Sequence, residues 1–300
     1  MTQYTEKPIP ILPDLENYTE TAFIDSPLVP VEENDRIDIR MLYPVLGFQN
    51  AESRCLLRKE AWDMLQNAAE KLPEGYRFRI WDAWRPFALQ KELFISYSAD
   101  VIRDFHLEGL PEEEQHQFIN KFVANPIPDR DLPPAHTTGG AVDLTLLDPS
   151  GNELEMGCGF DAFSDRTRAA YYETEAAQSL PDAETIRSNR RLLYNIMLNA
   201  GFTNLPSEWW HFEYGDKNWA HVTGQPALYN GNFRTVEHII FGSVITVMTL
   251  PFFSSCVPHG KYRSTGRPGG FRTAPSLPQS WSFTTIFPEL SLVFCDKTQF

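Results

Sequence analysis

Apolar residues recur at two different spacings along the first part of the chain. Spacings of three and four residues predict helices, and they occur in residues 51–72, 87–97, 111–123 and 182–200. Alternating or unbroken apolar positions predict strands, and they occur in residues 76–82, 141–147 and 209–214. Turn-forming residues end these segments, such as Pro73 after the first helix and Gly201 after the last.

The order of these elements indicates the fold class. The sequence DPSGN, directly after the strand at 141–147, has the turn chemistry of a hairpin. Strands joined by hairpins, with helices elsewhere in the chain, are typical of α+β proteins. We therefore predict an α+β fold in which helices flank a small, mostly antiparallel sheet.

The charge pattern changes near residue 230. Residues 231–300 contain six Lys/Arg and three Asp/Glu, whereas residues 1–230 contain 20 and 37. One uncharged apolar run, residues 239–253, is 15 residues long and is interrupted by Gly242 and Pro251. A membrane-spanning helix needs roughly 20 such residues. We predict that the chemistry lies in a domain of residues 1–230. Residues 231–300 would be an irregular C-terminal extension, packed or poorly ordered, and membrane contact is not expected.

Composition narrows the function classes. A hydrophobic content of 42% and an aromatic content of 13% are globular values. The formal net charge of −14 argues against a nucleic-acid partner, because such proteins need a basic face. The four cysteines form no C-x-x-C pair, which argues against a zinc ribbon or a redox pair. The first 20 residues lack a basic segment followed by an apolar core, so a cytoplasmic location is expected.

A carboxylate stands where the pattern predicts a buried strand. Asp143 lies inside the apolar run 141–147, seven residues after His136. Gly139 and Gly140 between them would let the chain bend tightly. Asp143 could cap a turn, or it could be a ligand that a metal holds in place.

A second unusual stretch is SEWWHF, residues 207–212. Glu208 and His211 stand among two tryptophans and a phenylalanine, so we expect both to be partly desolvated. A buried carboxylate is costly unless it is paired or coordinated. On a continuous strand the two side chains would face opposite sides, so we place Glu208 at the edge between loop and strand.

Together with the WDAWRP stretch at residues 81–86, these residues fit a catalytic zinc site. Such a site commonly has three His and Asp/Glu ligands, and His136, Asp143 and His211 supply them. Glu208 would then be a base that is not a ligand and takes the proton of the attacking water. Arg85 would be a fixed cation for the oxyanion that forms on the carbonyl.

Each of these residues also has an ordinary structural interpretation. His136 could precede a turn, Glu208 could be a surface acid, and Arg85 could be a salt-bridge partner. The remaining histidines have no matching acid partner and are interpreted as surface or core residues; they are His106, His116, His221, His238 and His259. Spacing alone leaves the zinc site one of several interpretations.

The motifs taken together resemble a known family. The pattern His-x-x-Gly-x-Ala-x-Asp begins at His136, and Glu-x-x-His begins at Glu208. This pattern resembles the zinc D-Ala-D-Ala metallopeptidases, and most closely the VanX-type D-alanyl-D-alanine dipeptidases. The supporting segments occur in family order over residues 38–215; they are DIR, CLLRKEA, WDAWRP, AVDLTL, NRRLLYNIMLNAGF and EWWH.

The resemblance implies a small α+β peptidase domain that binds one Zn²⁺ per chain through His136, Asp143 and His211. It implies that Glu208 is the catalytic base and Arg85 the group that stabilises the transition state. The substrate would be the free dipeptide D-Ala-D-Ala, which links the chain to cell-wall metabolism. Asp161, in MGCGFDAF, matches by position the family's aspartate that binds the amino group of the substrate.

Two positions depart from the family pattern. Pro134 replaces a serine two residues before the first histidine, and Met41 replaces a tyrosine, although Tyr43 is close by. Both changes affect substrate preference more than metal binding.

The leading hypothesis is a zinc dipeptidase. The alternatives are a D,D-carboxypeptidase or endopeptidase that acts on longer peptidoglycan stems, and a non-catalytic zinc-stabilised binding module.

Overall fold

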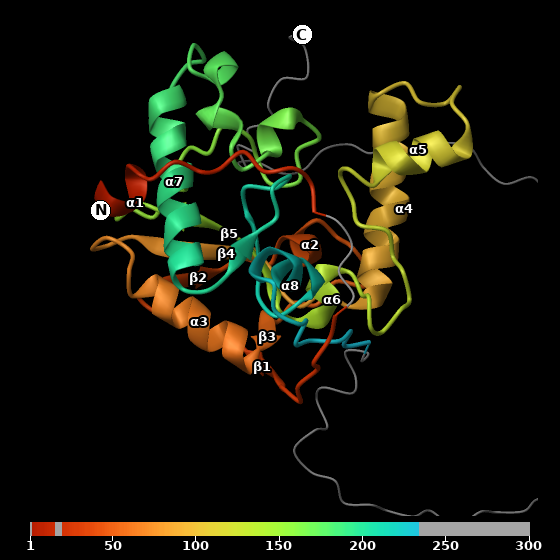
Figure 1. The fold of residues 1–300 in the computed structure, drawn as a ribbon, viewed down its shortest axis with the longest axis horizontal. Coiled ribbons are helices and arrows are strands. Elements are labelled where there is room, and N and C mark those ends of the chain that lie inside the picture. Colours follow the sequence, from red (N-terminus) through yellow and green to blue (C-terminus); the bar gives the residue numbers. More distant parts are fainter. Residues whose placement is uncertain (1, 16–19, 234–300) are drawn as a thin grey trace, which may run out of the picture. The chain divides into compact units, whose positions relative to one another are not determined.

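The structure is a computed structural model, and it describes residues 2–15 and 20–233 (Figure 1). The extension predicted for residues 231–300 therefore lies outside the described residues except at its start, and the domain boundary near residue 230 stays a prediction. The backbone carbonyls of Asn230 and Asn232 accept hydrogen bonds from the side chains of Arg58 and Trp84. Contacts with the folded part thus continue past residue 230.

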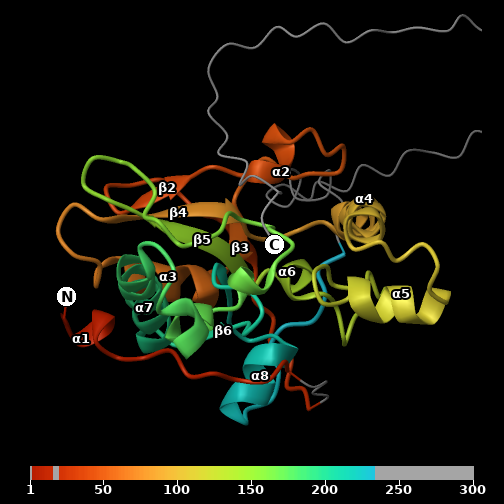
Figure 2. The same ribbon diagram turned by 90° about the horizontal axis from the view of Figure 1, so that it is seen from above.

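A five-stranded sheet crosses the middle of the domain in the order β2-β4-β5-β7-β6 (Figures 1 and 2). Its strands are β2 (Ile37–Ile39), β4 (Arg77–Asp82), β5 (Ala141–Leu147), β6 (Thr203–Asn204) and β7 (His211–Glu213). Only β2 and β4 pair in parallel, and the other three pairs are antiparallel. A separate antiparallel pair joins β1 (Leu28–Pro30) and β3 (Leu56–Arg58). The predicted α+β class and mostly antiparallel sheet are confirmed.

Helices surround the sheet, and the long ones lie where the apolar spacing predicts them. The α-helices are α1 (Thr2–Thr5), α2 (Leu42–Val45), α3 (Lys59–Ala69), α4 (Phe87–Asp104), α5 (Glu112–Ile119), α6 (Ala135–Thr138), α7 (Ala183–Asn199) and α8 (Lys217–Thr223). Helices α3 and α7 lie together on one face of the sheet, and α4 and α5 form a pair at one end (Figure 2).

The main core lies between the sheet and the helices α3 and α7. Leu65 of α3 and Ile196 of α7 are fully buried with Phe78 and Leu144 of the sheet. The first half of α7 buries Ala183, Ile186 and Arg190 at spacings of three and four residues, whereas every residue from Leu192 to Met197 is buried, so the second half of the helix is enclosed on all sides. A second cluster, centred on Val101, joins α4 to α5.

Two sequence-based boundaries are wrong, each because a distant backbone group competes for hydrogen bonds. The helix predicted from residue 51 begins at Lys59, because β3 pairs with β1 and Arg58 N–H donates to the Gly139 carbonyl at 2.8 Å. The strand predicted from residue 209 begins at His211, because Trp209 N–H donates to Thr167. The turn predicted after β5 is present: Asp148 N–H donates to the Asn152 carbonyl at 2.8 Å, and Leu147 pairs with Glu153 in an antiparallel bridge.

The central strands bring the unusual acids and histidines together. Asp143 is opposite His211 in the β5–β7 ladder and opposite Asp82 in the β4–β5 ladder, next to a register irregularity. Gly139 ends α6 with a φ of +81°, a conformation that glycine adopts without strain. A Cβ at Gly140 would lie 2.1 Å from the Tyr214 carbonyl oxygen, so only glycine fits there. The chain between His136 and Asp143 bends as predicted.

Candidate metal and catalytic site

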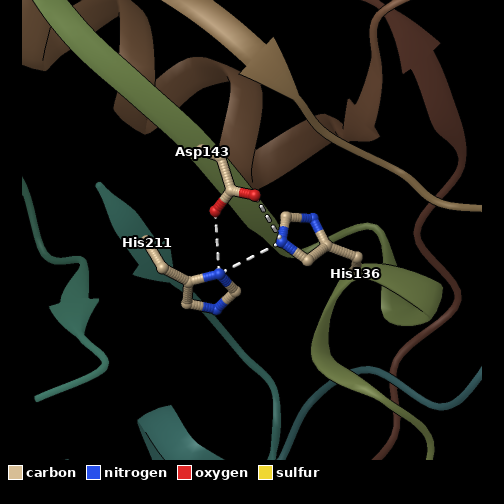
Figure 3. Close-up of side chains that lie close together, drawn as sticks. All are labelled: His136, Asp143 and His211. Atoms are coloured by element: carbon tan, nitrogen blue, oxygen red, sulfur yellow. Dashed lines mark hydrogen bonds and ion pairs between the residues drawn. The ribbon is translucent and has the colours of Figure 1, made fainter. Parts of the chain in front are cut away.

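Three buried side chains from α6, β5 and β7 meet at one point (Figure 3). His136 Nε2 lies 3.1 Å from Asp143 Oδ2, and His211 Nδ1 lies 2.9 Å from Asp143 Oδ1. The two inner ring nitrogens are 3.1 Å apart. Of the residues that the structure describes, these three form the group whose ligand atoms lie close enough to hold one metal ion.

The outer nitrogens of both histidines are fixed by acceptors. His136 Nδ1 lies 2.7 Å from the backbone carbonyl of Ala83, and His211 Nε2 lies 2.8 Å from Glu213 Oε1. A carbonyl or carboxylate only accepts, so each outer nitrogen carries a proton. This arrangement leaves the inner nitrogens of neutral rings with lone pairs that face each other and the Asp143 carboxylate. Metal-binding histidines are commonly held in this way.

The cluster therefore requires a positive charge at its centre. Although burial acts in the opposite direction, Asp143 and Glu213 raise the pKa of His211 well above its ordinary value. Burial likewise opposes the shift at Asp143, but His136 and His211 lower the pKa of its carboxyl. A proton or a metal cation can supply this charge, and the two nitrogen donors with one carboxylate suit zinc.

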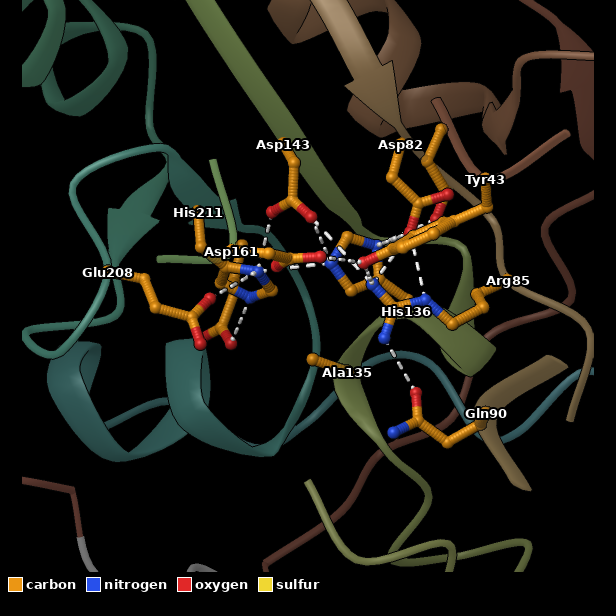
Figure 4. A network of polar contacts seen from close by, with 12 residues as sticks. Tyr43, Asp82, Arg85, Gln90, Ala135, His136, Asp143, Asp161, Glu208 and His211 are labelled. Atoms are coloured by element: carbon orange, nitrogen blue, oxygen red, sulfur yellow. Dashed lines mark hydrogen bonds and ion pairs between the residues drawn. The ribbon is translucent and has the colours of Figure 1, made fainter. Parts of the chain in front are cut away.

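Arg85 is a buried and fully engaged cation beside this cluster (Figure 4). Its Nε donates to Asp82 Oδ2 at 2.9 Å, and its two Nη atoms donate to Gln90 Oε1 at 2.8 Å and Tyr43 Oη at 3.2 Å. One Nη also lies 3.8 Å from Asp143 Oδ2. Because all three nitrogens of the guanidinium donate hydrogen bonds, the positive charge of Arg85 is held at a fixed position.

Asp161 enters the cavity from a loop in which its own φ is +55°. Its Oδ2 accepts hydrogen bonds from Tyr43 Oη and Tyr97 Oη, both at 2.9 Å. Burial, together with the charge of Asp143, raises the pKa of the Asp161 carboxyl to about 6. It is therefore an anion at neutral pH that lacks a cationic hydrogen-bond partner among the described residues, and a cationic ligand would stabilise it.

Glu208 lies in the turn before β7, at the edge where the sequence places it. Its Oε2 is 3.7 Å from His211 Nδ1, too far for a hydrogen bond. Burial raises the pKa of the Glu208 carboxyl to about 8. A carboxyl whose pKa lies near the operating pH can both accept and return a proton, which suits a general acid–base group.

All six residues singled out from the sequence line one cavity of about 500 Å³; they are Arg85, His136, Asp143, Asp161, Glu208 and His211. Pro134 lines it as well, at the position where the family pattern has a serine. The structure thus brings the whole predicted set together, although their chemical roles stay predictions.

Sequence reasoning missed four residues of this site. Glu213 could have been found, because it follows His211 by two positions on a strand and therefore shares its face. Asp82 stands in WDAWRP and pairs with Arg85. Tyr43 and Tyr97 hold Asp161 from α2 and α4, and no local pattern marks either for that role.

Comparison with known proteins agrees with this geometry. Residues 44–236 match the Peptidase_M15 family model, described as D-ala-D-ala dipeptidase, which covers more than half of the chain. The chain belongs to this family. The match includes all six cavity residues named above, so the resemblance found in the motifs is confirmed at the level of the family.

Three relatives carry the name D-alanyl-D-alanine dipeptidase. The protein from Synechocystis sp. is 35% identical over 154 residues, which are 49% of this chain and 62% of the relative. That from Escherichia coli is 32% identical over 163 residues, 54% of this chain and 68% of the relative. That from Enterococcus faecium is 31% identical over 148 residues, 48% of this chain and 65% of the relative. This chain thus spans somewhat less than two thirds of the first relative's length.

One solved structure aligns with this chain at a TM-score of 0.33. It is the zinc complex of a mutant VanY, a vancomycin-resistance D,D-pentapeptidase from a VanB-type resistance cassette. It is 14% identical, and the alignment covers 66% of this chain and 91% of that one.

In the part of the chain that the structure describes, no helix is both long and apolar enough to cross a membrane.

Proposed function

We propose that this chain is a zinc-dependent dipeptidase that hydrolyses D-Ala-D-Ala or a close dipeptide to free amino acids. The observation that carries the proposal is the shared cavity. It combines a three-donor cluster, a partly desolvated carboxylate at Glu208, a fixed cation at Arg85 and a half-buried anion at Asp161. In zinc-dependent hydrolysis of a peptide that carries a free amino group, these four components can activate water, carry a proton, stabilise the oxyanion and bind the ammonium group.

The donor set fits one zinc ion per chain. Catalytic zinc sites take three protein ligands and leave a further position open. His136, Asp143 and His211 provide these ligands, and Ala83 and Glu213 fix the ring orientations. Zinc at this point would polarise the scissile carbonyl and lower the pKa of water toward about 7.

Glu208 is the proposed proton carrier. It stands beside the metal-binding cluster without being held by a hydrogen bond to it. Glu208 accepts a proton as water attacks the carbonyl carbon, and it returns that proton to the nitrogen of the leaving amino acid as the C–N bond breaks. One water is consumed, and one new carboxyl and one new amino group are produced.

Arg85 is proposed to stabilise the negative charge that forms on the carbonyl oxygen. A preorganised donor in a water-poor cavity stabilises such a charge without having to reorganise during the reaction. The bonds from Arg85 to Asp82, Gln90 and Tyr43 provide this preorganisation. The nearby Asp82 offsets the cost of burying the guanidinium.

Asp161 is proposed to bind the ammonium group of the substrate. We expect Asp161→Asn to raise KM for D-Ala-D-Ala by about 10- to 100-fold, since a charge-assisted hydrogen bond to the ammonium is lost. Hydrolysis of N-acetyl-D-Ala-D-Ala should change little, because that substrate has no ammonium group. Asp35→Asn, at an exposed aspartate outside the cavity, serves as the control. An equal effect on both substrates would contradict the assignment.

Glu213 is proposed to hold His211 in its metal-binding orientation. We expect Glu213→Gln to weaken zinc binding by about 10- to 100-fold, the usual cost of losing a group that orients a ligand. Competition with a chromophoric chelator measures the affinity. The matched control is Glu108→Gln, at an exposed glutamate. Unchanged zinc affinity in Glu213→Gln would show that its charge is not needed.

The proposal itself is tested by release of free alanine from D-Ala-D-Ala, measured before and after dialysis against a chelator. We expect turnover that disappears with the metal and returns with added zinc. No alanine release at any zinc loading would refute the dipeptidase activity. Faster hydrolysis of N-acylated peptides than of the free dipeptide would favour the alternative, a carboxypeptidase.

A further inference from the structure

A single side chain joins the two ends of the loop that carries Asp161. Arg190, on α7, donates from Nε to the Met156 carbonyl at 2.8 Å. Its Nη1 donates to the Arg168 carbonyl and its Nη2 to the Arg166 carbonyl, both at 2.7 Å. The segment between these anchors, residues 157–165, is named the 157–165 loop from here on.

Arg190 makes these contacts as a hydrogen-bond donor to backbone rather than as an ion-pair partner. Its side chain is 2% exposed, and the guanidinium stacks on Tyr172 and Trp209. No carboxylate among the described residues accepts a hydrogen bond from it. A buried, planar fork of donors is well suited to fixing several carbonyls at once.

The far side of the 157–165 loop contacts the wall of the active-site cavity. Phe160 packs on Tyr43 and Trp81, and Phe163 packs on Tyr97. Asp161 stands between these two phenylalanines in the sequence, and its φ of +55° lies in the left-handed region, which few non-glycine residues other than Asn and Asp adopt. The position of Asp161 therefore depends on both the anchor at α7 and the contacts at α4.

We propose that Arg190 is a positioning residue for substrate binding: by closing the 157–165 loop, it fixes Asp161 where the ammonium group of a dipeptide is received. This inference rests on the proposed role of Asp161. Arg190 lies behind the loop and not in the cavity lining, so it acts through Asp161. Its neighbour Arg191 binds Glu173 instead and provides a matched control on the same helix.

The first test measures the loop without using activity. Lysine keeps the charge at position 190 but cannot reach both ends of the loop. In Arg190→Lys we expect hydrogen–deuterium exchange in residues 157–169 to be at least about 10-fold faster, whereas exchange in β5 and the zinc content stay unchanged. Arg191→Lys should leave residues 157–169 as they are. Unchanged exchange in Arg190→Lys would overturn the inference, whatever the protein's activity.

The second test is a double-mutant cycle. We expect Arg190→Lys to raise KM for D-Ala-D-Ala by about 10-fold with a smaller change in kcat, because a displaced Asp161 loses part of its hydrogen bond to the substrate's ammonium group. In the Asp161→Asn background the same substitution should change KM less than about twofold. Additive effects would show that Arg190 supports the fold in general and would overturn the inference.

A second variant keeps the inference testable if Arg190→Lys does not fold. Phe163→Ala loosens the loop from the α4 side, where Phe163 contacts Tyr97 and Phe122, and leaves α7 intact. It should show the same faster exchange and the same dependence on Asp161, and additive effects would again refute the inference. A parent chain that does not hydrolyse D-Ala-D-Ala would refute the proposed function, and the exchange experiment would still decide whether Arg190 fixes the loop.

Discussion

We expect the Glu208→Gln variant to hydrolyse D-Ala-D-Ala about 10³-fold more slowly than the parent chain, with the loss in kcat. General acid–base groups contribute about 10²- to 10⁴-fold. Glutamine has nearly the shape of glutamate but cannot accept the proton of the attacking water. Glu208 is not one of the three ligands, so the zinc content should stay at that of the parent chain. Steady-state kinetics together with metal analysis measure both quantities.

The control for this variant is Glu108→Gln, an exposed glutamate outside the cavity. It should keep the parent kcat. A Glu208→Gln variant that retains more than about a tenth of the parent kcat would contradict the role of Glu208 as the base. A variant that loses stability while the parent chain has no activity to lose would support the third hypothesis, a zinc-stabilised binding module.

Substitution of His136 by asparagine is expected to remove both zinc and activity. His136 is one of the three proposed ligands, and these three form the candidate group among the described residues. Removing a group that merely orients a ligand costs about 10- to 100-fold in affinity, so removing the ligand itself should cost more than about 100-fold. Isothermal titration with zinc gives the affinity, and alanine release gives the activity. Both should fail to recover at zinc concentrations that saturate the parent chain.

His106→Asn is a well-matched control for this experiment. His106 is exposed, lies outside the cavity and has a φ of +56°, which asparagine tolerates. It should bind zinc and hydrolyse D-Ala-D-Ala as the parent chain does. Full activity in His136→Asn would mean that the metal, if the reaction uses one, binds elsewhere.

Much of the fold follows from local pattern. The helix α7 and the strand β5 begin and end within a few residues of where the apolar spacing predicts them. The errors occur at β3 and β7, where short segments could be read as helix or longer strand. At these segments the secondary structure depends on hydrogen-bond partners far away in sequence, such as the Gly139 carbonyl that accepts from Arg58 N–H.

The sequence by itself identified the residues that are proposed to carry the chemistry, because His136, Asp143, Glu208 and His211 are unusual among their apolar neighbours and their order resembles a family. Only the tertiary structure decided how they act together. Ala83 and Glu213 fix the ring nitrogens of His136 and His211, two tyrosines donate to Asp161, and Arg190 binds backbone carbonyls on both sides of the loop that carries Asp161. The physical reason is that spacing is a property of neighbouring residues. A hydrogen bond between segments distant in sequence exists only once the sheet and helices have packed.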